Sequence, residues 1–176
     1  MKIRRARAAD AGAIHAIISE YAAQGILLAR SLEEIRRHAA RFLVLADEEP
    51  RNGSGTAVYG CVALEPYGTS LAEVRSLAVL PGQRGAGLGR RLLRFALRTA
   101  KQRGVERVFA VTGSPQFFLR HGFTLSSRHA LPEKVAHDCR VCSKERTCRL
   151  TAVVKPLQKR RVLLPVLTEE AETTVA

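Results

Sequence analysis

The sequence contains no tryptophan, and aromatic residues make up only 5% of its 176 residues. Proteins that bind single-stranded nucleic acid stack the bases on aromatic side chains, so such a platform is poorly supplied here. The four cysteines do not resemble the disulfide framework of a small secreted protein. No uninterrupted apolar run approaches the roughly 18 residues that a membrane helix requires. We therefore expect neither a membrane protein nor a disulfide-stapled one.

Hydrophobic residues make up 46% of the chain, which argues against wholesale disorder. A chain of this length suits one compact domain, which buries roughly 70% of its unfolded surface. From Pro156 onward the composition turns basic and then acidic without a clear period, so we predict one domain over residues 1–155 and a flexible tail over 156–176. The opening stretch, MKIRRARAAD, lacks the apolar core of a secretory signal, and we predict a cytoplasmic protein.

Positive charge dominates the chain, since 29 Lys and Arg stand against 16 Asp and Glu, for a net charge of +13. A field of this sign attracts anionic partners over a long range. The charge does not choose among them, because nucleic acid, a polyphosphate cofactor and a dicarboxylate substrate would all be drawn in.

Apolar spacing and turn signals predict alternating helices and strands. Helices are predicted at 10–24, at 31–41 with Ser31 and Glu34 as a capping box, at 88–103, and in a short segment from Ser114. Strands are predicted at 2–5, 42–47, 57–66, 71–80, 107–112, 123–127 and 150–155. The stretch EEPRNGSGT reads as the turn of an antiparallel hairpin, and the strand, loop, helix, strand unit over 71–112 as a crossover between parallel strands.

Residues 79–93, VLPGQRGAGLGRRLL, bring four glycines within eight positions to the start of a helix. Unpaired N–H groups at a helix start attract anions, and glycines let a phosphate approach the backbone. A P-loop is excluded, because Gly82 and Gly87 are followed by Leu88 and Gly89 where Lys and a hydroxyl residue are needed.

A dinucleotide-binding fingerprint is also excluded, since its third glycine would fall on Arg90 or Leu92. The spacing that remains is Arg-x-x-Gly-x-Gly, which Arg84, Gly87 and Gly89 meet. With a strand before it and an amphipathic helix after it, this loop favours phosphate binding over a plain strand-to-helix turn.

The loop resembles the acetyl-CoA pyrophosphate loop of the GNAT-type N-acetyltransferase superfamily. The resemblance rests on the strand, the proline, QRGAGLG and the amphipathic helix, and SPQFFLRHGF supplies the short helix ending in Gly-Phe that is usual there. Beyond this core, GILLARS, LAEVRSLAV, PQFFLRHGF and PEKVAHDCRVCSKERTC together resemble N-acetylglutamate synthases in a short form without an amino-acid-kinase domain. The resemblance covers residues 1 to about 155.

This resemblance implies the GNAT fold, an α/β (α+β) sandwich in which helices flank a central, mixed, mostly antiparallel sheet. A splayed pair of parallel strands would form the site of acetyl-CoA, the implied co-substrate. The pyrophosphate would lie on the backbone of Arg84, Gly85, Ala86, Gly87, Leu88, Gly89 and Arg90. Main-chain groups of Leu77, Ala78 and Val79 would hold the pantetheine and the acetyl carbonyl.

Glu73 is our candidate general base. Strand alternation predicts that Glu73, Arg75, Leu77 and Val79 share one face, which would aim Glu73 at the acceptor. An α-amino group titrates near ~8 in peptides and is largely protonated at neutral pH, so a base is useful. The alternative interpretation of Glu73 is a solvated carboxylate at a strand end.

The usual general acid of the superfamily is missing from the short helix. Many GNAT enzymes carry a Tyr four residues before the Gly-Phe pair, which protonates the departing thiolate, and this chain has Phe118 there. Water or another residue would have to protonate the thiolate. His121 is nearby in sequence, but a His just before a helix-ending glycine is more simply a capping or surface residue.

A glutamate acceptor presents two carboxylates, which call for guanidinium forks or ammonium groups. Arg30, Arg75 and Lys134 lie in the segments that match the synthases, and the resemblance makes them our candidate carboxylate ligands. In so basic a chain, each of them is otherwise interpreted as a solvated surface cation.

The stretch HDCRVCSKERTC supplies Cys139, Cys142, Cys148 and His137, which are enough in number for a four-ligand zinc site. The third cysteine follows after only five residues and no second pair exists, so reduced thiols packed beside the acceptor pocket are the other interpretation. We assign no metal. Cys61, in the apolar run VYGCVAL, is predicted to be a small buried core residue.

The sequence therefore predicts an acetyl-CoA-dependent N-acetyltransferase for the α-amino group of an amino acid, with L-glutamate as the leading acceptor, in the first step toward arginine. A GNAT enzyme for another small amine or a protein N-terminus is the alternative within the class. The opposing class is a basic nucleic-acid-binding module, with or without stabilisation by zinc. We expect a small-molecule partner, no nucleic acid or membrane partner, and by resemblance a homodimer.

Overall fold

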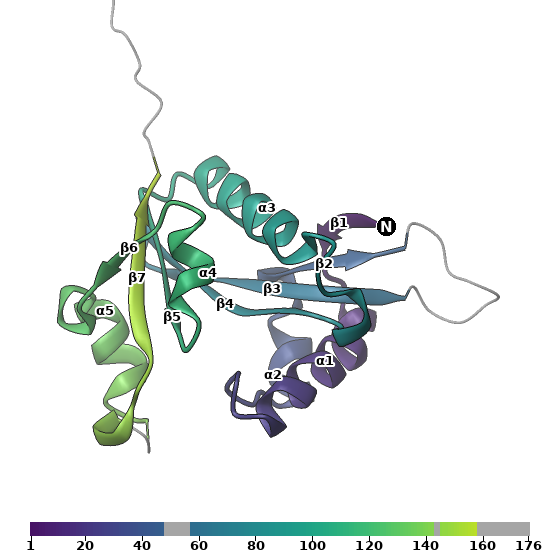
Figure 1. The fold of residues 1–176 in the computed structure, drawn as a ribbon, viewed down its shortest axis with the longest axis horizontal. Coiled ribbons are helices and arrows are strands. Elements are labelled where there is room, and N and C mark those ends of the chain that lie inside the picture. The colour runs from purple at the N-terminus through teal and green to yellow at the C-terminus, as the bar shows by residue number, and fades with distance from the viewer. Residues whose placement is uncertain (48–56, 143–144, 158–176) are drawn as a thin grey trace, which may run out of the picture.

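The computed structural model describes residues 1–47, 57–142 and 145–157. Within them, one sheet of seven strands runs in the order β1-β2-β3-β4-β5-β7-β6 (Figure 1). Only the pair β4 and β5 is parallel among these neighbours. The strands are β1 (Lys2–Arg5), β2 (Phe42–Ala46), β3 (Val58–Tyr67), β4 (Leu71–Val79), β5 (Arg107–Thr112), β6 (Thr124–Ser126) and β7 (Thr151–Pro156).

Helices cover both faces of this sheet, as predicted. They are α1 (Ala11–Ala23), α2 (Leu32–Arg37), α3 (Leu88–Gln102), α4 (Pro115–Leu119) and α5 (Pro132–Lys134), and a π-helical turn (Val135–Cys139) continues α5. Figure 1 shows α3 over one face of the sheet and α1 and α2 over the other. The predicted mixed, mostly antiparallel sheet with flanking helices is confirmed.

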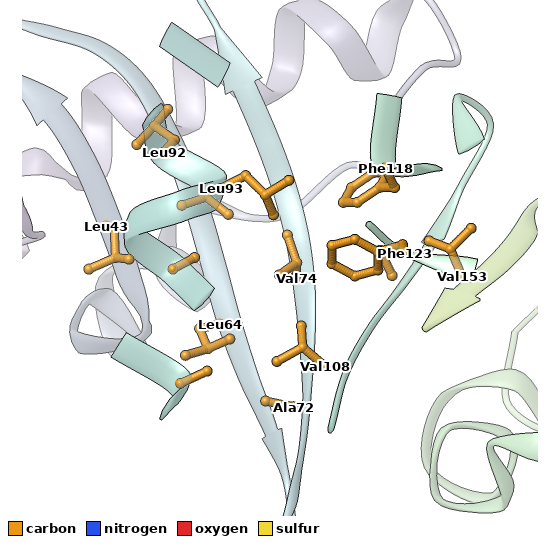
Figure 2. Packing of buried hydrophobic residues seen from close by; sticks show 14 of the residues in the cluster. Leu43, Leu64, Ala72, Val74, Leu92, Leu93, Val108, Phe118, Phe123 and Val153 are labelled. Atoms are coloured by element: carbon orange, nitrogen blue, oxygen red, sulfur yellow. The ribbon is translucent and has the colours of Figure 1, made fainter. Parts of the chain in front are cut away.

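The largest core lies between α3 and the sheet, and Figure 2 shows it from close by. Helix α3 buries its apolar residues at helical spacing, while Arg and Lys take the exposed positions between them. The buried residues of the strands, of α4 and of the turn after α4 that meet it include Leu43, Leu64, Ala72, Val74, Val108, Phe118, Phe123 and Val153. This packing fixes the start of α3, and with it the glycine loop, against the end of β4.

A second core lies between α1, α2 and the opposite face of the sheet. The apolar stripe of α1 buries Ile14, Ile17, Ile18 and Tyr21 there, together with Cys61 of β3. The prediction that Cys61 is a buried core residue is confirmed. A third, smaller cluster beside the segment that contains α5 includes Tyr67, Leu71, Phe109, Leu131 and Ala152.

The two parallel strands separate soon after they meet. Leu71, Ala72 and Glu73 of β4 pair with Arg107, Val108 and Phe109 of β5, and no later pair of these two strands follows within the described residues. Since β4 continues to Val79, its second half is not paired with β5. The predicted splayed pair is thus confirmed, and Glu73 lies where the strands part.

A β-bulge in β4 overturns the predicted alternation of its side chains. Cys61 pairs with Ala78 but Ala63 with Arg75, so that two residues of β4 oppose one residue of β3. Ser76 lies in this bulge with φ +50°, a conformation uncommon outside glycine. The extra residue reverses the two faces of the strand beyond it.

Unbroken alternation predicts one shared face for Glu73, Arg75, Leu77 and Val79. This prediction is wrong, because the bulge places Leu77 and Val79 on the opposite face from Glu73 and Arg75. Arg75 lies opposite Ala63, on the face of α1 and α2, whereas Leu77 and Val79 pack against the core under α3. The bulge also explains Gly60, because a Cβ there would come within 2.8 Å of the Ala78 carbonyl oxygen.

The helix predicted over 31–41 is shorter than expected. Helix α2 ends at Arg37, and residues 39–41 form a separate turn of 3-10 helix. Half of the predicted capping box is present, since the Glu34 N–H donates to Ser31 Oγ at 3.1 Å. The Glu34 carboxylate instead accepts from Arg30, because that buried guanidinium is the stronger partner.

Two predicted segments fall outside the described residues: the hairpin turn EEPRNGSGT and residues 158–176 of the predicted tail. The hairpin itself is confirmed by the antiparallel pairing of β2 with β3. In the part of the chain that the structure describes, no helix is both long and apolar enough to span a membrane.

Candidate active site

The glycine loop takes backbone conformations that favour glycine. Gly85 has φ +88° and Gly87, the N-cap of α3, has φ +70°. The first main-chain hydrogen bond of α3 runs from the Arg91 N–H to the Gly87 carbonyl, at 3.0 Å. Among the described residues, no main-chain carbonyl accepts from the N–H groups of residues 85–90. Free donors at the N-terminus of a long helix suit an anion with several oxygens, such as a diphosphate.

Tyr21, at the end of α1, links this loop to the end of β4. Its hydroxyl donates to the Val79 carbonyl oxygen at 2.5 Å and accepts from Arg84 Nε at 2.9 Å. The Arg84 guanidinium also lies over the Tyr21 ring, 4.9 Å from its centre. From the sequence, Tyr21 was predicted only to be one of the apolar positions of a helix. No signal in the chain indicated that its hydroxyl would bind residues 58 and 63 positions away.

Three of the predicted site residues, Glu73, Arg75 and Lys134, meet on the face of the sheet opposite to α3. Lys134 Nζ lies 2.8 Å from Glu73 Oε2, and Arg75 Nε lies 3.4 Å from the same oxygen. The structure adds two residues that sequence reasoning missed. Asp138 Oδ2 lies 2.5 Å from Lys134 Nζ and 3.4 Å from an Arg75 nitrogen, and the Tyr67 hydroxyl contacts both carboxylates.

This charged cluster is largely shielded from water, since the side chains of Glu73 and Lys134 are 3% and 8% exposed. Burial raises the pKa of Tyr67, and the charge of Glu73 and the hydrogen bond to Asp138 raise it further, so the phenol remains a donor. Burial also works to raise the pKa of Asp138, but hydrogen bonds from Lys134 and Tyr67 hold it well below its ordinary value. The cluster therefore contains two cations and two carboxylates.

Arg30 stands apart from this cluster. Its side chain is only 9% exposed, pairs with Glu34 and lies over the Phe42 ring, 5.3 Å from the ring centre. Among the described residues, its NH1 group is the buried side-chain polar group that has no hydrogen-bond partner. A buried guanidinium N–H without a partner is costly, and an oxygen of a ligand or of water would offset that cost.

The position of Arg30 relative to the cluster follows from the sheet. Phe42 pairs with Ala63, and Ala63 pairs with Arg75, so these three residues form one row on one face. Two strand spacings separate Phe42 from Arg75, which is ~10 Å between backbones. The small side chain of Ala63 lies between them. A molecule with two carboxylates could therefore reach from Arg75 toward Arg30 along this face.

The charge of Arg30 also reaches the middle of this face. Burial raises the pKa of the Cys61 thiol to about 12, and the positive charge of Arg30 acts in the opposite direction. Cys61 lies two residues before Ala63 on the same strand and points to the same face. The guanidinium therefore lies above β2 and β3, on the side that carries the charged cluster.

The short helix α4 places its residues as the sequence predicts. Phe118 is buried among aromatic rings in the α3 core, where it offers no proton donor. His121 Nδ1 lies 2.6 Å from the Phe117 carbonyl oxygen, the contact of a helix-capping residue.

The cysteine-rich segment forms no cluster in the described residues. All four cysteines are free thiols, and no group of three or more His, Cys, Asp or Glu side chains there gathers as metal ligands would. His137 turns to Asp138 instead, with Nδ1 2.9 Å from Oδ1. The residues described here do not fit a zinc site.

The chain is similar to known proteins in sequence and in fold. Residues 12–123 match the family described as Acetyltransferase (GNAT) family. The chain is 41% identical over 155 residues to an uncharacterized N-acetyltransferase from Chlorobaculum tepidum, which covers 88% of this chain and 96% of that protein. It is 35% identical over 142 residues to an amino-acid acetyltransferase from Neisseria meningitidis, which covers 80% of this chain but 31% of that protein.

Among solved structures, the fold is similar to that of N-acetylglutamate synthase from Neisseria gonorrhoeae, complexed with coenzyme A and N-acetyl-glutamate. The TM-score is 0.77 at 31% sequence identity, and the match covers 90% of this chain and 35% of that one. The chain thus spans about a third of the length of these two Neisseria proteins.

Proposed function

The chain belongs to the acetyltransferase (GNAT) family, whose co-substrate is acetyl-CoA, and from this premise we propose that it acetylates the α-amino group of L-glutamate. This reaction yields N-acetylglutamate and free CoA, and it is the first step toward arginine. The similarity to amino-acid acetyltransferases and to a synthase bound to N-acetyl-glutamate supports an amino-acid acceptor. A cytoplasmic location and a homodimer remain predictions.

The observation that carries the glutamate proposal is the unpartnered, buried N–H of Arg30 on the face that bears Glu73, Arg75 and Lys134. In an amino acid the α-amino and α-carboxyl groups share one carbon, so a base that reaches the amine lies beside the α-carboxylate. Arg75 and Lys134 would then bind the α-carboxylate next to Glu73. The side-chain carboxylate would extend along the face to Arg30, whose fork suits a carboxylate.

The donor would enter from the other face. Free N–H groups of residues 85–90 would bind the pyrophosphate, and main-chain groups of 77–79 the pantetheine and the acetyl carbonyl. Because the bulge directs Leu77 and Val79 away from Glu73, donor and acceptor would meet through the gap where β4 leaves β5. This arrangement keeps the two substrates on separate sides until the reacting atoms touch.

In this arrangement the protein positions the two substrates and accepts one proton. Glu73 takes a proton from the ammonium group, and the free amine attacks the acetyl carbonyl to form the C–N bond. The nitrogen of the tetrahedral adduct still carries one extra proton, which it loses to water as the C–S bond breaks, and the products are the amide and the CoA thiolate. Phe118 cannot protonate it, so we assign that proton to water.

The direct test is thiol release with a set of L-amino acids and acetyl-CoA. We expect L-glutamate to give the highest kcat/KM, with L-aspartate slower because its shorter side chain falls short of Arg30. Thiol release with small amines or peptide N-termini but not with amino acids would replace glutamate by the alternative acceptors. Steeply salt-dependent binding to DNA or RNA without any thiol release would instead favour the basic binding module.

Tyr21→Phe should weaken binding of acetyl-CoA but not of the acceptor. The variant keeps the ring under Arg84 but loses the hydroxyl that holds the Val79 carbonyl and Arg84 Nε. We expect the KM for acetyl-CoA to rise about tenfold, the value of one hydrogen bond to a charged group, with the KM for glutamate little changed.

Tyr59→Phe is the matched control for this prediction. It removes a phenol hydroxyl that donates to Asp47 at 2.8 Å, without touching Val79 or Arg84. Steady-state kinetics with either substrate varied would separate the two variants. Equal rises in the KM for acetyl-CoA in both would show that the loss of any such hydroxyl, and not the link to β4, causes the effect.

A further inference from the structure

Asp138 occupies the two cations that are proposed to bind the α-carboxylate. Its Oδ2 contacts Lys134 Nζ at 2.5 Å, an Arg75 nitrogen at 3.4 Å and the Tyr67 hydroxyl at 2.5 Å. An ammonium group has three donors, and those of Lys134 already face Glu73, Asp138 and Tyr67. An incoming carboxylate therefore finds no free donor on Lys134 while Asp138 stays in place.

The electrostatics explain why a carboxylate has to occupy this place in the free protein. Two cations, Lys134 and Arg75, are held largely away from water, and Glu73 alone would leave one positive charge without a partner. An uncompensated buried charge is strongly destabilising. Asp138 brings the charge of the cluster to balance when no ligand is bound.

Asp138 is also the carboxylate that can leave. Glu73 is 3% exposed and belongs to a central strand, whereas Asp138 is 24% exposed and belongs to the π-helical turn outside the sheet. Its second oxygen, Oδ1, faces His137, which is 77% exposed. A small rotation of the side chain would move the carboxylate from the cluster toward solvent, and water would replace the lost contacts.

We propose that Asp138 stands in for the acceptor's α-carboxylate in the free enzyme, and that the acceptor binds by exchanging its own carboxylate for Asp138. This inference rests on the proposed function. The exchange conserves charge, since one carboxylate leaves the cluster and another enters. It also makes Asp138 a determinant of specificity, because a neutral amide has no charge with which to displace a carboxylate from two cations.

The test is calorimetric binding of L-glutamate in the presence of CoA, which requires no turnover. Asp138→Asn keeps the shape but removes the competing charge, so we expect L-glutamate to bind about tenfold more tightly, the equivalent of one charge-assisted hydrogen bond. Asp138→Asn should also bind the α-amide of glutamate, which the wild-type protein should reject. Weaker or unchanged binding of L-glutamate to D138N would overturn the exchange.

Glu65→Gln is the matched control, because it removes the same charge from the same face. Glu65 pairs with Arg41 and its charge is felt by Arg75, yet it contacts neither Arg75 nor Lys134 among the described ion pairs. If long-range charge alone mattered, E65Q and D138N would tighten glutamate binding equally, and that result would contradict the exchange. We expect a change of less than about threefold for E65Q, because Glu65 pairs with Arg41 and contacts neither of the two cations.

Two further outcomes are informative. If D138N does not fold, His137→Ala replaces it, because it removes the exposed side chain that contacts Asp138 Oδ1 and the edge of the Tyr67 ring, and it should tighten glutamate binding by a smaller factor. An unchanged Kd in H137A would then count against the exchange. If the wild-type protein binds no glutamate and releases no thiol with it, the proposed function fails and the exchange with it.

Discussion

Glu73→Gln should lower kcat by about 10²- to 10⁴-fold, the usual contribution of a general base. The amide cannot accept the ammonium proton, so the reaction would depend on the small fraction of acceptor whose amine is already free. The residual rate should therefore climb with pH toward and beyond ~8, where peptide α-amino groups titrate. Initial rates at saturating acetyl-CoA across this pH range measure both effects.

The control for Glu73 is again Glu65→Gln, which changes a carboxylate of the neighbouring strand, directly opposite Glu73, without reaching the proposed acceptor. Binding of CoA to both variants should match the wild type, because the proposed donor site lies on the other face of the sheet. A Glu73→Gln enzyme with an unaltered pH–rate profile would remove Glu73 from proton transfer and leave it as a structural partner of Lys134.

Arg30→Met should raise the KM for L-glutamate on the order of 10²-fold, because losing one partner of a buried charge pair costs 2–5 kcal/mol or more. The KM for acetyl-CoA should change little. The thermal stability of the variant distinguishes binding of the acceptor from a structural role of Arg30. NH1 of Arg30 has no partner in the free protein, and the partner of its other nitrogens, Glu34, is 41% exposed, so we expect the Tm to fall by no more than a few degrees.

Arg30→Lys tests the geometry of the same contact. The ammonium group keeps the charge but not the planar fork that binds a carboxylate through two parallel hydrogen bonds. We expect an intermediate KM for glutamate. A large loss of stability in Arg30→Met, with equal rises in both KM values, would mean that Arg30 serves the fold through Glu34 and Phe42 and not the acceptor.

Glu73 and Arg30 differ in how well the sequence pattern predicts their neighbours in the candidate site. Arg30, Arg75 and Lys134 were chosen because their segments resemble those of synthases, and the structure brings two of them to Glu73. The third lies on the same face but two strands away. Sequence spacing contains no information on such distances, because they depend on which strands become neighbours.

The missed residues share a physical reason. Tyr21 and Tyr67 make contacts with residues 58 to 71 positions away, of which an isolated Tyr carries no local signal. Asp138 did have a local signal, its i,i+4 spacing from Lys134, but that spacing does not predict the contact with Arg75. The β4 bulge was missed for a related reason. Nothing in LAEVRSLAV marks Ser76 as the extra residue, which arises from the register between β3 and β4.

The sequence by itself determined the elements and the conformation of the glycine loop, because both depend on local chemistry. Apolar spacing defines α1 and α3, and glycine at 85 and 87 permits the left-handed backbone that leaves donor groups free. Only the tertiary structure decided the acceptor side. Strand register turned Leu77 and Val79 to the opposite face from Glu73. Long-range packing brought Lys134 and Asp138, which are only four residues apart, onto Glu73 and Arg75, because the chain order does not specify which distant residues become neighbours.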